Sequence, residues 1–176
     1  ADTLAPATQI TFPAPNTAYK GNIVSGAAYP LTGTATDPNS PWNAGVKQVQ
    51  IRLSYLSGND TWYWQSGVAF SSGTGVSNSG WLDTADTAWN YFTGVPWRGV
   101  DSLYTMESRA EDDSYQANGT PAGNVGVPET PGTDIVTFTI DDTPPTQGIT
   151  TPAGTNLQAL PLISGTADAA LSGYNR

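Results

Sequence analysis

Carboxylates are the side chains of this sequence that could take part in chemistry, because the chain contains 15 Asp and Glu residues but no His and no Cys. Without His and Cys, Ser-His triads, thiol nucleophiles and the usual zinc sites are excluded. A hydrolase that uses two carboxylates needs one acid in an apolar pocket and a second at a set distance. Asp83 and Asp86, close to Trp81, come nearest to this pattern. Two acids in one short stretch do not define an active site, so we expect a protein that is not an enzyme.

The tryptophans are the second set of candidate functional residues. Carbohydrate-binding β-sandwiches stack sugar rings on exposed aromatic side chains, so a row of such residues on one sheet face could bind a glycan. Against this, a sandwich of this length needs several of its six Trp residues in the core. Trp62 and Trp64 share one strand face and Tyr63 takes the other, so one of these two sets is expected to be buried. The candidate ligand-binding residues are Trp62, Trp64, Trp81, Trp89 and Trp97.

Composition predicts an all-β protein and limits the classes of partner that it could bind. Only 12% of the residues are charged, and 19 Gly and 14 Pro supply turns rather than helices. A net charge of -9 argues against a nucleic-acid partner, because phosphate binding needs a basic surface, and it suits cations better. No stretch of the sequence approaches the length of a membrane span. The lack of cysteine fits either a cytosolic protein or an exported bacterial one.

Strand patterns recur at the short spacing that is typical of a β-sandwich. The clearest is 46–55, where Val49, Ile51, Leu53 and Tyr55 alternate with polar residues. Ser66 to Gly80 is rich in Gly and Ser, which indicates a loop or a ragged edge hairpin. The sequence therefore predicts about seven strands before residue 142, together with an aromatic-rich insertion from about Thr61 to Trp97. Besides 46–55, the expected strands are 9–12, 29–36, 61–65, 103–112 and 133–141.

An internal repeat links the two ends of the chain. The opening ADTLAPATQITFP matches the later DDTPPTQGITTP in kind and order, and the phrase GTATD that follows the first has a counterpart, GTAD, after the second. The offset is about 132 to 140 residues, which fits one repeat unit followed by the start of another. We therefore expect residues 145–176 to form the first two strands of a second unit.

Together these features resemble the bacterial immunoglobulin-like (Ig-like or cadherin-like) repeats that occur in tandem in large secreted adhesins, filaments and cell-envelope proteins. The resemblance covers most of the chain in short pieces, and the aromatic insertion is longer than in compact members of that family. In such a fold Tyr104, at the start of its strand, can act as a tyrosine corner, with its hydroxyl bonded to the backbone upstream near Asp101. The other interpretation is that Tyr104 is an ordinary core tyrosine. The segments that carry the resemblance are 33–37, 44–52, 101–104, 109–112, 123–124 and 137–145.

The resemblance also implies an architecture and a role. Residues 1–142 would form an immunoglobulin-like antiparallel sandwich, and residues 143–176 a linker and the first two strands of an incomplete repeat. The protein would be extracellular or at the bacterial cell surface, and would serve cell adhesion or structure in a stalk, filament or surface layer. Because two strands cannot bury an apolar face alone, residues 143–176 need completion by an adjacent repeat of the same chain or by strand addition from another copy. Cell-surface glycans are the alternative partner.

Calcium is the cofactor that the acidic residues favour, since it requires several hard oxygen ligands. In a sandwich of this strand order, the loop after the second strand and the loop before the last strand meet where the chain enters. A second group at the opposite end would face the next unit and stiffen the junction, as in calcium-bound members of the resembled family. The other interpretation is that these residues cap their own turns. The candidate metal ligands are Asp2, Asp37, Glu111, Asp112 and Asp113 at the first end, and Asp141, Asp142 and Asp168 at the second.

Overall fold

Strands are the only regular elements among the residues that the computed structural model describes, which confirms the prediction of an all-β protein. The predicted strands are all present, with ends that move by two residues at most. Four short strands were not predicted individually. One, Ala69–Ser71, lies within the edge hairpin expected at 66–80, and the others are Ala18–Tyr19, Leu82–Asp83 and Ala88–Tyr91. The described residues are 2–21, 24, 29–38, 44–65, 69–73, 80–84, 87–91, 94–98, 101–115, 122–151, 159 and 162–168.

The smaller sheet of the main body has three antiparallel strands in the order β1-β3-β8. Leu31, Gly33 and Ala35 point inward from β3 and alternate with outward-facing threonines, as the sequence predicts. A Cβ atom on Gly33 would collide with the Trp89 ring and with the Gln9 carbonyl, so glycine is required for this close packing. The strands of this sheet are β1 (Ala7–Phe12), β3 (Leu31–Thr36) and β8 (Ala88–Tyr91).

The larger sheet has seven strands, with β4 and β9 at its centre. β4 pairs antiparallel with β9 along almost its whole length, from Val49 opposite Ala110 to Tyr55 opposite Tyr104. On its other side β4 pairs with β5 and β7 over different stretches, and β6 extends the sheet as an edge hairpin with β5. The bounds are β2 (Ala18–Tyr19), β4 (Val46–Ser57), β5 (Asp60–Gln65), β6 (Ala69–Ser71), β7 (Leu82–Asp83), β9 (Ser102–Asp112) and β10 (Ile135–Ile140).

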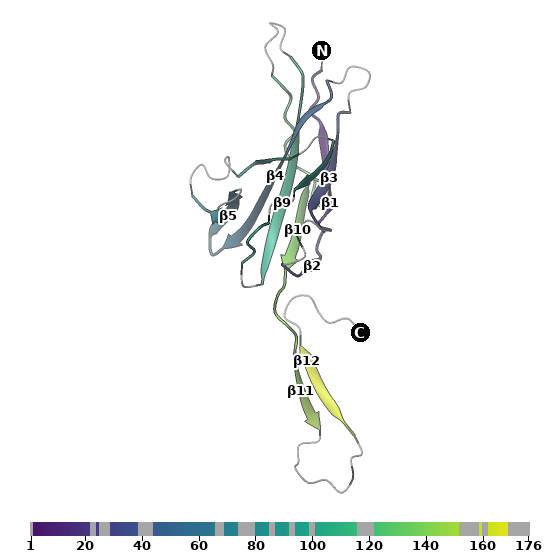
Figure 1. Cartoon of the computed structure of the whole chain (residues 1–176), viewed down its shortest axis with the longest axis vertical. Coiled ribbons are helices and arrows are strands. Elements are labelled where there is room, and N and C mark those ends of the chain that lie inside the picture. Colours follow the sequence, from purple (N-terminus) through teal and green to yellow (C-terminus); the bar gives the residue numbers. More distant parts are fainter. Residues whose placement is uncertain are drawn as a thin grey trace.

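The two sheets bury their inner faces against each other (Figure 1). Leu31 and Trp89 of the smaller sheet belong to the same buried cluster as Ile51, Met106 and Phe138 of the larger one. A buried hydrogen bond also joins the sheets, since the Trp64 indole N–H donates to the Tyr91 hydroxyl over 2.9 Å. The chain therefore forms a β-sandwich-like core in which aromatic side chains supply much of the buried area.

Tyr104 lies at the centre of an aromatic cluster near the start of β9. Its ring is fully buried and contacts Tyr55, Phe70, Trp97 and Phe138. Its hydroxyl accepts a hydrogen bond of 3.0 Å from the backbone N–H of Arg98, six residues upstream. The predicted bond to upstream backbone is therefore present, and its donor lies slightly farther back than Asp101.

A separate two-stranded sheet follows the sandwich. β11 (Thr146–Thr151) and β12 (Ser164–Asp168) pair antiparallel, and Figure 1 shows this hairpin extending beyond the packed sheets after β10. Ile149 pairs with Gly165, and a β-bulge follows at Thr150. In the smaller sheet Ile10 pairs with Gly33, and a bulge again follows Ile10. The hairpin β11–β12 therefore has the same register and the same bulge as β1–β3.

Candidate metal site

Three carboxylates from distant parts of the sequence meet at the N-terminal end of the sandwich. Asp2 precedes β1, Asp37 follows β3 and Asp112 ends β9, and one oxygen from each lies within 4.8 Å of the other two. Two like charges about 4 Å apart repel by roughly 4 kcal/mol at the dielectric of a protein surface. A cation among the three would remove that repulsion and would find hard oxygen ligands.

Asp112 is the fixed centre of this group. Its side chain is fully buried and accepts hydrogen bonds from the backbone N–H groups of Ser114 and Asn124, at 3.0 and 2.8 Å, and from the Asn124 side-chain amide at 2.8 Å. Burial by itself would raise the pKa of Asp112, but these hydrogen bonds outweigh it and hold the pKa below the ordinary value of 3.8. Asp112 is therefore ionised at neutral pH and supplies a permanent negative charge.

Asp2 and Asp37 both hold the segment that leads into β4. Asp2 accepts a hydrogen bond of 2.8 Å from the Ala44 backbone N–H, and Asp37 accepts one of 2.8 Å from that of Gly45. These bonds are the turn-capping role that Asp performs well. Asp2 also accepts a hydrogen bond of 3.1 Å from the Leu4 backbone N–H. A carboxylate has about four lone-pair positions, so these hydrogen bonds leave capacity for a cation as well.

Glu111 and Asp113 do not join the three carboxylates, which corrects the prediction that the whole acidic run converges. Successive side chains of a strand point to opposite faces, so Asp112 points inward while Glu111 points outward. Glu111 there forms an ion pair with Lys47 of the adjacent strand β4. Asp113 is exposed beyond the end of β9. Alternation along the strand thus selects one ligand from the run of three.

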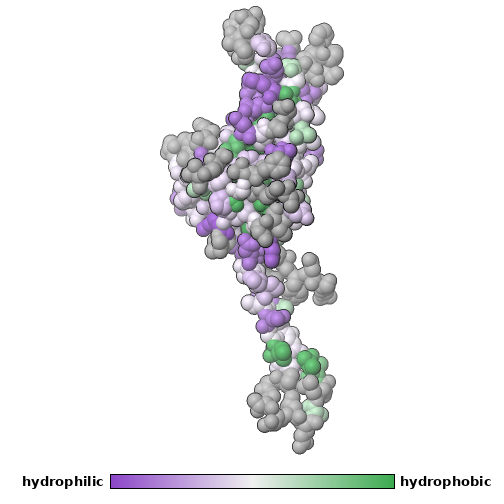
Figure 2. Space-filling view, viewed as in Figure 1, coloured by the Kyte–Doolittle hydropathy of each residue, from purple (hydrophilic) through white to green (hydrophobic). Residues whose placement is uncertain are grey.

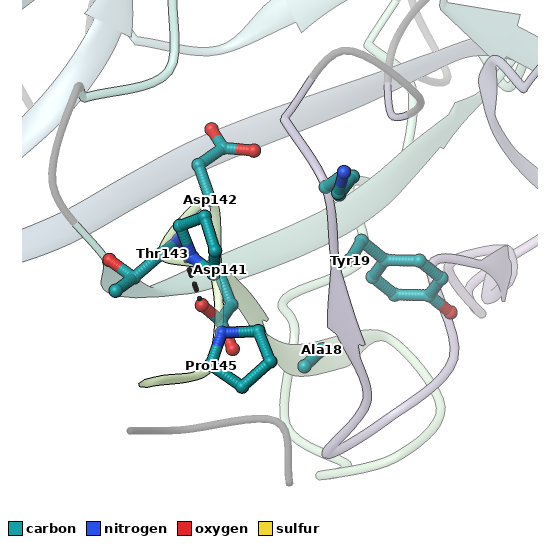
Figure 3. Close-up of a pocket in the computed structure, with 8 residues that line it drawn as sticks. Ala18, Tyr19, Asp141, Asp142, Thr143 and Pro145 are labelled. Atoms are coloured by element: carbon teal, nitrogen blue, oxygen red, sulfur yellow. Dashed lines mark hydrogen bonds between the residues drawn. The ribbon is translucent and has the colours of Figure 1, made fainter. Parts of the chain in front are cut away.

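The predicted second metal group does not form at the opposite end of the sandwich. The Asp141 carboxylate accepts a hydrogen bond of 3.2 Å from the Thr143 N–H, and that of Asp142 accepts one of 3.0 Å from the Gly21 N–H. The two side chains line one pocket but point in different directions (Figure 3). Within the described ranges, Asp2, Asp37 and Asp112 are the one group of three acids close enough to share an ion.

Asp168 does not occupy the position equivalent to Asp37. With Gly165 aligned on Gly33, Asp168 lies at the end of β12 opposite Thr146, just as Thr36 lies opposite Ala7. The second phrase, GTAD, is one residue shorter than GTATD, so its aspartate falls on the strand rather than after it. Because of this single missing residue, the counterpart phrases GTATD and GTAD do not place Asp37 and Asp168 at equivalent positions.

Asp101 is an acid with a lowered pKa that lies outside the candidate metal site. Its pKa is lowered, mainly by a hydrogen bond from the Thr143 side chain and also by the backbone N–H groups of Asp142 and Thr143. Those two N–H groups lie 2.9 and 3.2 Å from the Asp101 carboxylate. Asp101 therefore caps the segment that leaves β10, which is a turn-capping role.

Burial corrects the predicted aromatic platform. The side chains of Trp64 and Trp89 are 2% and 1% exposed, so neither can present a flat ring to a sugar. Trp62 is stacked on Tyr55, and Trp97 packs edge-on against Tyr104. These four rings belong to the core or pack against it, which is the commoner place for a large aromatic side chain.

Trp81 is held on the outer face of the larger sheet by two arginines. The guanidinium of Arg109 lies 4.1 Å from the centre of its indole ring, and that of Arg52 lies 4.6 Å from it. Such cation–π contacts contribute about 0.5–1 kcal/mol at exposed sites. Trp81 therefore belongs to a surface network rather than to a row of free aromatic rings.

The same face carries hydrogen-bonded polar pairs between β4 and β9. Arg52 donates two hydrogen bonds to the Glu107 carboxylate, at 2.6 and 2.8 Å, and Arg109 donates two to the Gln50 side-chain oxygen, at 2.9 and 2.7 Å. Asp83, one of the two acids considered for hydrolysis, accepts a bond of 2.8 Å from the Gln50 amide. Asp86 lies outside the described residues.

Comparisons of the chain with protein-family models, with curated proteins and with solved structures found no significant match. None of the described segments forms a helix with the length and apolar character that a membrane crossing requires. The function proposed below therefore rests on the geometry of the chain itself.

Proposed function

We propose that this chain is a non-catalytic, immunoglobulin-like repeat that serves a structural or adhesive role outside a bacterial cell, as part of a stalk, filament or surface layer. The strand order supports this proposal. Variable-type immunoglobulin domains place the first, second, fourth and fifth strands on one sheet and the third, sixth and seventh, with two extra strands, on the other. Among the described residues, the smaller sheet has counterparts of the first, second and fifth strands and none of the fourth. Here β1, β3 and β8 form one sheet, and β10, β9, β4, β5 and β6 are consecutive in the other.

Two local features add support for the immunoglobulin-like class. The Tyr104 hydroxyl bonds to the backbone just before β9, at the corner where the chain passes from β8 to the other sheet. This is the position and role of the tyrosine corner. In addition, the register and bulge of β1–β3 recur in β11–β12, which is the behaviour expected of tandem units.

We further propose that Asp2, Asp37 and Asp112 bind calcium. The observation that carries this proposal is the approach of three carboxylate oxygens to within 4.8 Å of one another from three separate segments. A bound ion would tie the segment before β1 to the loop before β4 and to the end of β9. The calcium would thus stiffen the end at which the chain enters the sandwich, which is a mechanical contribution rather than a catalytic one.

Thermal unfolding with and without calcium tests this proposal. Adding Ca²⁺ to metal-free protein should raise the melting temperature in a saturable way, since a ligand that binds only the folded state stabilises it by mass action. Asp37→Asn should abolish the rise, because the amide oxygen can still accept the Gly45 N–H while the charge is lost. Asp113→Asn is the matched control and should keep the full rise, since Asp113 is exposed and outside the group. Equal responses of the two variants would rule out calcium at this site.

A further inference from the structure

The hairpin β11–β12 repeats β1–β3 in pairing but not in surroundings. Three apolar positions that are buried in the first hairpin are exposed in the second: Ile10 corresponds to Ile149, Leu31 to Ile163 and Ala35 to Ala167. Leu31 is 0% exposed, whereas Ile163 is 66% exposed. Figure 2 shows the resulting apolar surface on the hairpin.

Hydrogen bonding at the bulge supports the same alignment. The Thr11 and Thr32 hydroxyls lie 3.0 Å apart beside the bulge of β1, and the Thr150 and Ser164 hydroxyls lie 3.1 Å apart beside that of β11. The side chains thus match where the backbone registers match. The second hairpin is therefore built to the plan of the first, and an isolated two-stranded hairpin with such a face is marginally stable at best.

The first hairpin also shows what covers this face. β8 pairs antiparallel with β3, so that Trp89 lies opposite Gly33 and Tyr91 lies opposite Leu31. The Trp89 ring packs directly over Gly33, where no side chain would fit. In β12 the equivalent positions are Gly165 and Ile163, and an open groove runs along Gly165 and Ile149.

We propose that the partner of this hairpin is a further sandwich unit that lacks its own β1–β3 pair and supplies a strand of the β8 type. That strand would run antiparallel along β12, with an indole opposite Gly165 and a second aromatic ring opposite Ile163. This inference rests on the proposed repeat function and specifies its junction. A second copy of the chain does not fit the role, because the matching edge of its β8 is already paired with its own β3.

A tandem chain tests the proposal. Residues 37–142 are attached after Asp168, which occupies the position of Thr36, so that the hairpin is followed by the strands that follow β3 in the first unit. The backbone amides of β11 and β12 should become protected from hydrogen exchange in this tandem chain and exchange faster in the 176-residue chain. Ile163→Ser should remove that protection in the tandem chain and leave the melting temperature of the 176-residue chain unchanged.

Engineered disulfides then test the register, in a chain that has no cysteine of its own. Thr34 and Ala88 face each other on the outer side of the first unit, and Ala35 donates to the Thr87 carbonyl beside them. Thr34 and Ala88 are therefore a non-hydrogen-bonded pair, whose side chains come closest. In the tandem chain, Thr166→Cys should form a disulfide with the second Ala88→Cys and none with the second Asn90→Cys. Thr34→Cys with Ala88→Cys in the 176-residue chain is the positive control.

The outcomes separate this inference from the repeat function on which it rests. If the attached unit unfolds as its own cooperative step but Thr166→Cys bonds only to Asn90→Cys, or to neither cysteine, the proposed register is overturned and the repeat function stands. If the attached unit does not fold, both fail. Protection of β11 and β12 that rises with the concentration of the 176-residue chain, with dimers in sedimentation, would assign the hairpin to a second copy and overturn the proposal.

Discussion

The two hairpins of this molecule share a plan and differ in their environment. β1–β3 and β11–β12 have the same register, the same bulge and the same pair of hydroxyls beside it. Yet Ile10 is 5% exposed and its counterpart Ile149 is 76% exposed. Strand pairing in this chain is therefore fixed by the two strands themselves, whereas burial comes from β8 and from the facing sheet. The comparison separates the two contributions, because only the first hairpin has both.

The largest difference between the two hairpins should appear when an equivalent apolar side chain is removed from each. Leu31→Ala should lower the free energy of unfolding of the sandwich by about 2–5 kcal/mol, because it leaves a cavity in the core. Ile163→Ala should change it by less than about 0.5 kcal/mol, as is usual for an exposed site. Urea denaturation followed by Trp fluorescence measures both. Equal losses would mean that the hairpin is packed against the sandwich rather than separate from it.

The last residues of β9 and β12 provide the next contrast. Asp112→Ala should cost about 1.5–3 kcal/mol at neutral pH, because it leaves the Ser114 and Asn124 donors without their charged acceptor. Asp168→Ala, at an exposed strand end, should cost less than about 0.5 kcal/mol. Denaturation curves of the two variants beside the unsubstituted chain are the measurement.

Acid should reveal the same difference without a substitution. Because the folded-state pKa of Asp112 is below 3.8, its stabilisation is present above that value and is lost as the pH falls through the lowered pKa. The unsubstituted chain should therefore lose stability in this range more steeply than Asp112→Ala does. The measurement is the free energy of unfolding of both proteins as a function of pH. If the two lose stability equally as the pH falls, Asp112 does not cause this effect.

The hydroxyl pairs should give the smallest contrast. Thr32→Ala removes the bond to Thr11 in the sandwich and should cost about 0.5–1 kcal/mol. Ser164→Ala removes the matching bond in the hairpin and should leave the unfolding of the sandwich unchanged. The second effect should appear only as faster exchange of the β11 and β12 amides. A loss of sandwich stability in Ser164→Ala would contradict the independence of the two hairpins.

Sequence periodicity was sufficient to predict the long strands. The alternation of Val49, Ile51 and Leu53 in β4 defines a buried face, and the neighbours Arg52 and Glu107 follow once β4 and β9 pair. Short strands such as β2 and β7 have two residues each, so they carry no readable period and depend on tertiary pairing.

Alignment of the two repeats by similar sequence motifs gave the wrong equivalent residues where the two copies differ in length by one residue. By residue type, Thr8-Gln9 matches Thr146-Gln147, but the strand register makes Gln9 equivalent to Gly148. In the same way, Asp168 ends GTAD as Asp37 ends GTATD, but in the paired strands Asp168 occupies the position of Thr36. Since side chains alternate along a strand, a shift of one residue reverses the face on which a ligand lies. The convergence of Asp2, Asp37 and Asp112 was predictable because it depends on which strand ends meet rather than on register.

The short strand β2 gives the sandwich a particular response to tension. β2 runs parallel to β10, and three backbone hydrogen bonds join residues 16–19 to residues 137–141: Asn16 to Thr137, Thr139 to Thr17 and Asp141 to Tyr19. A force that pulls the segment before β1 away from the linker after β10 acts along these two strands and across their hydrogen bonds. The three hydrogen bonds are then loaded in shear and must break together, rather than one after another from one end.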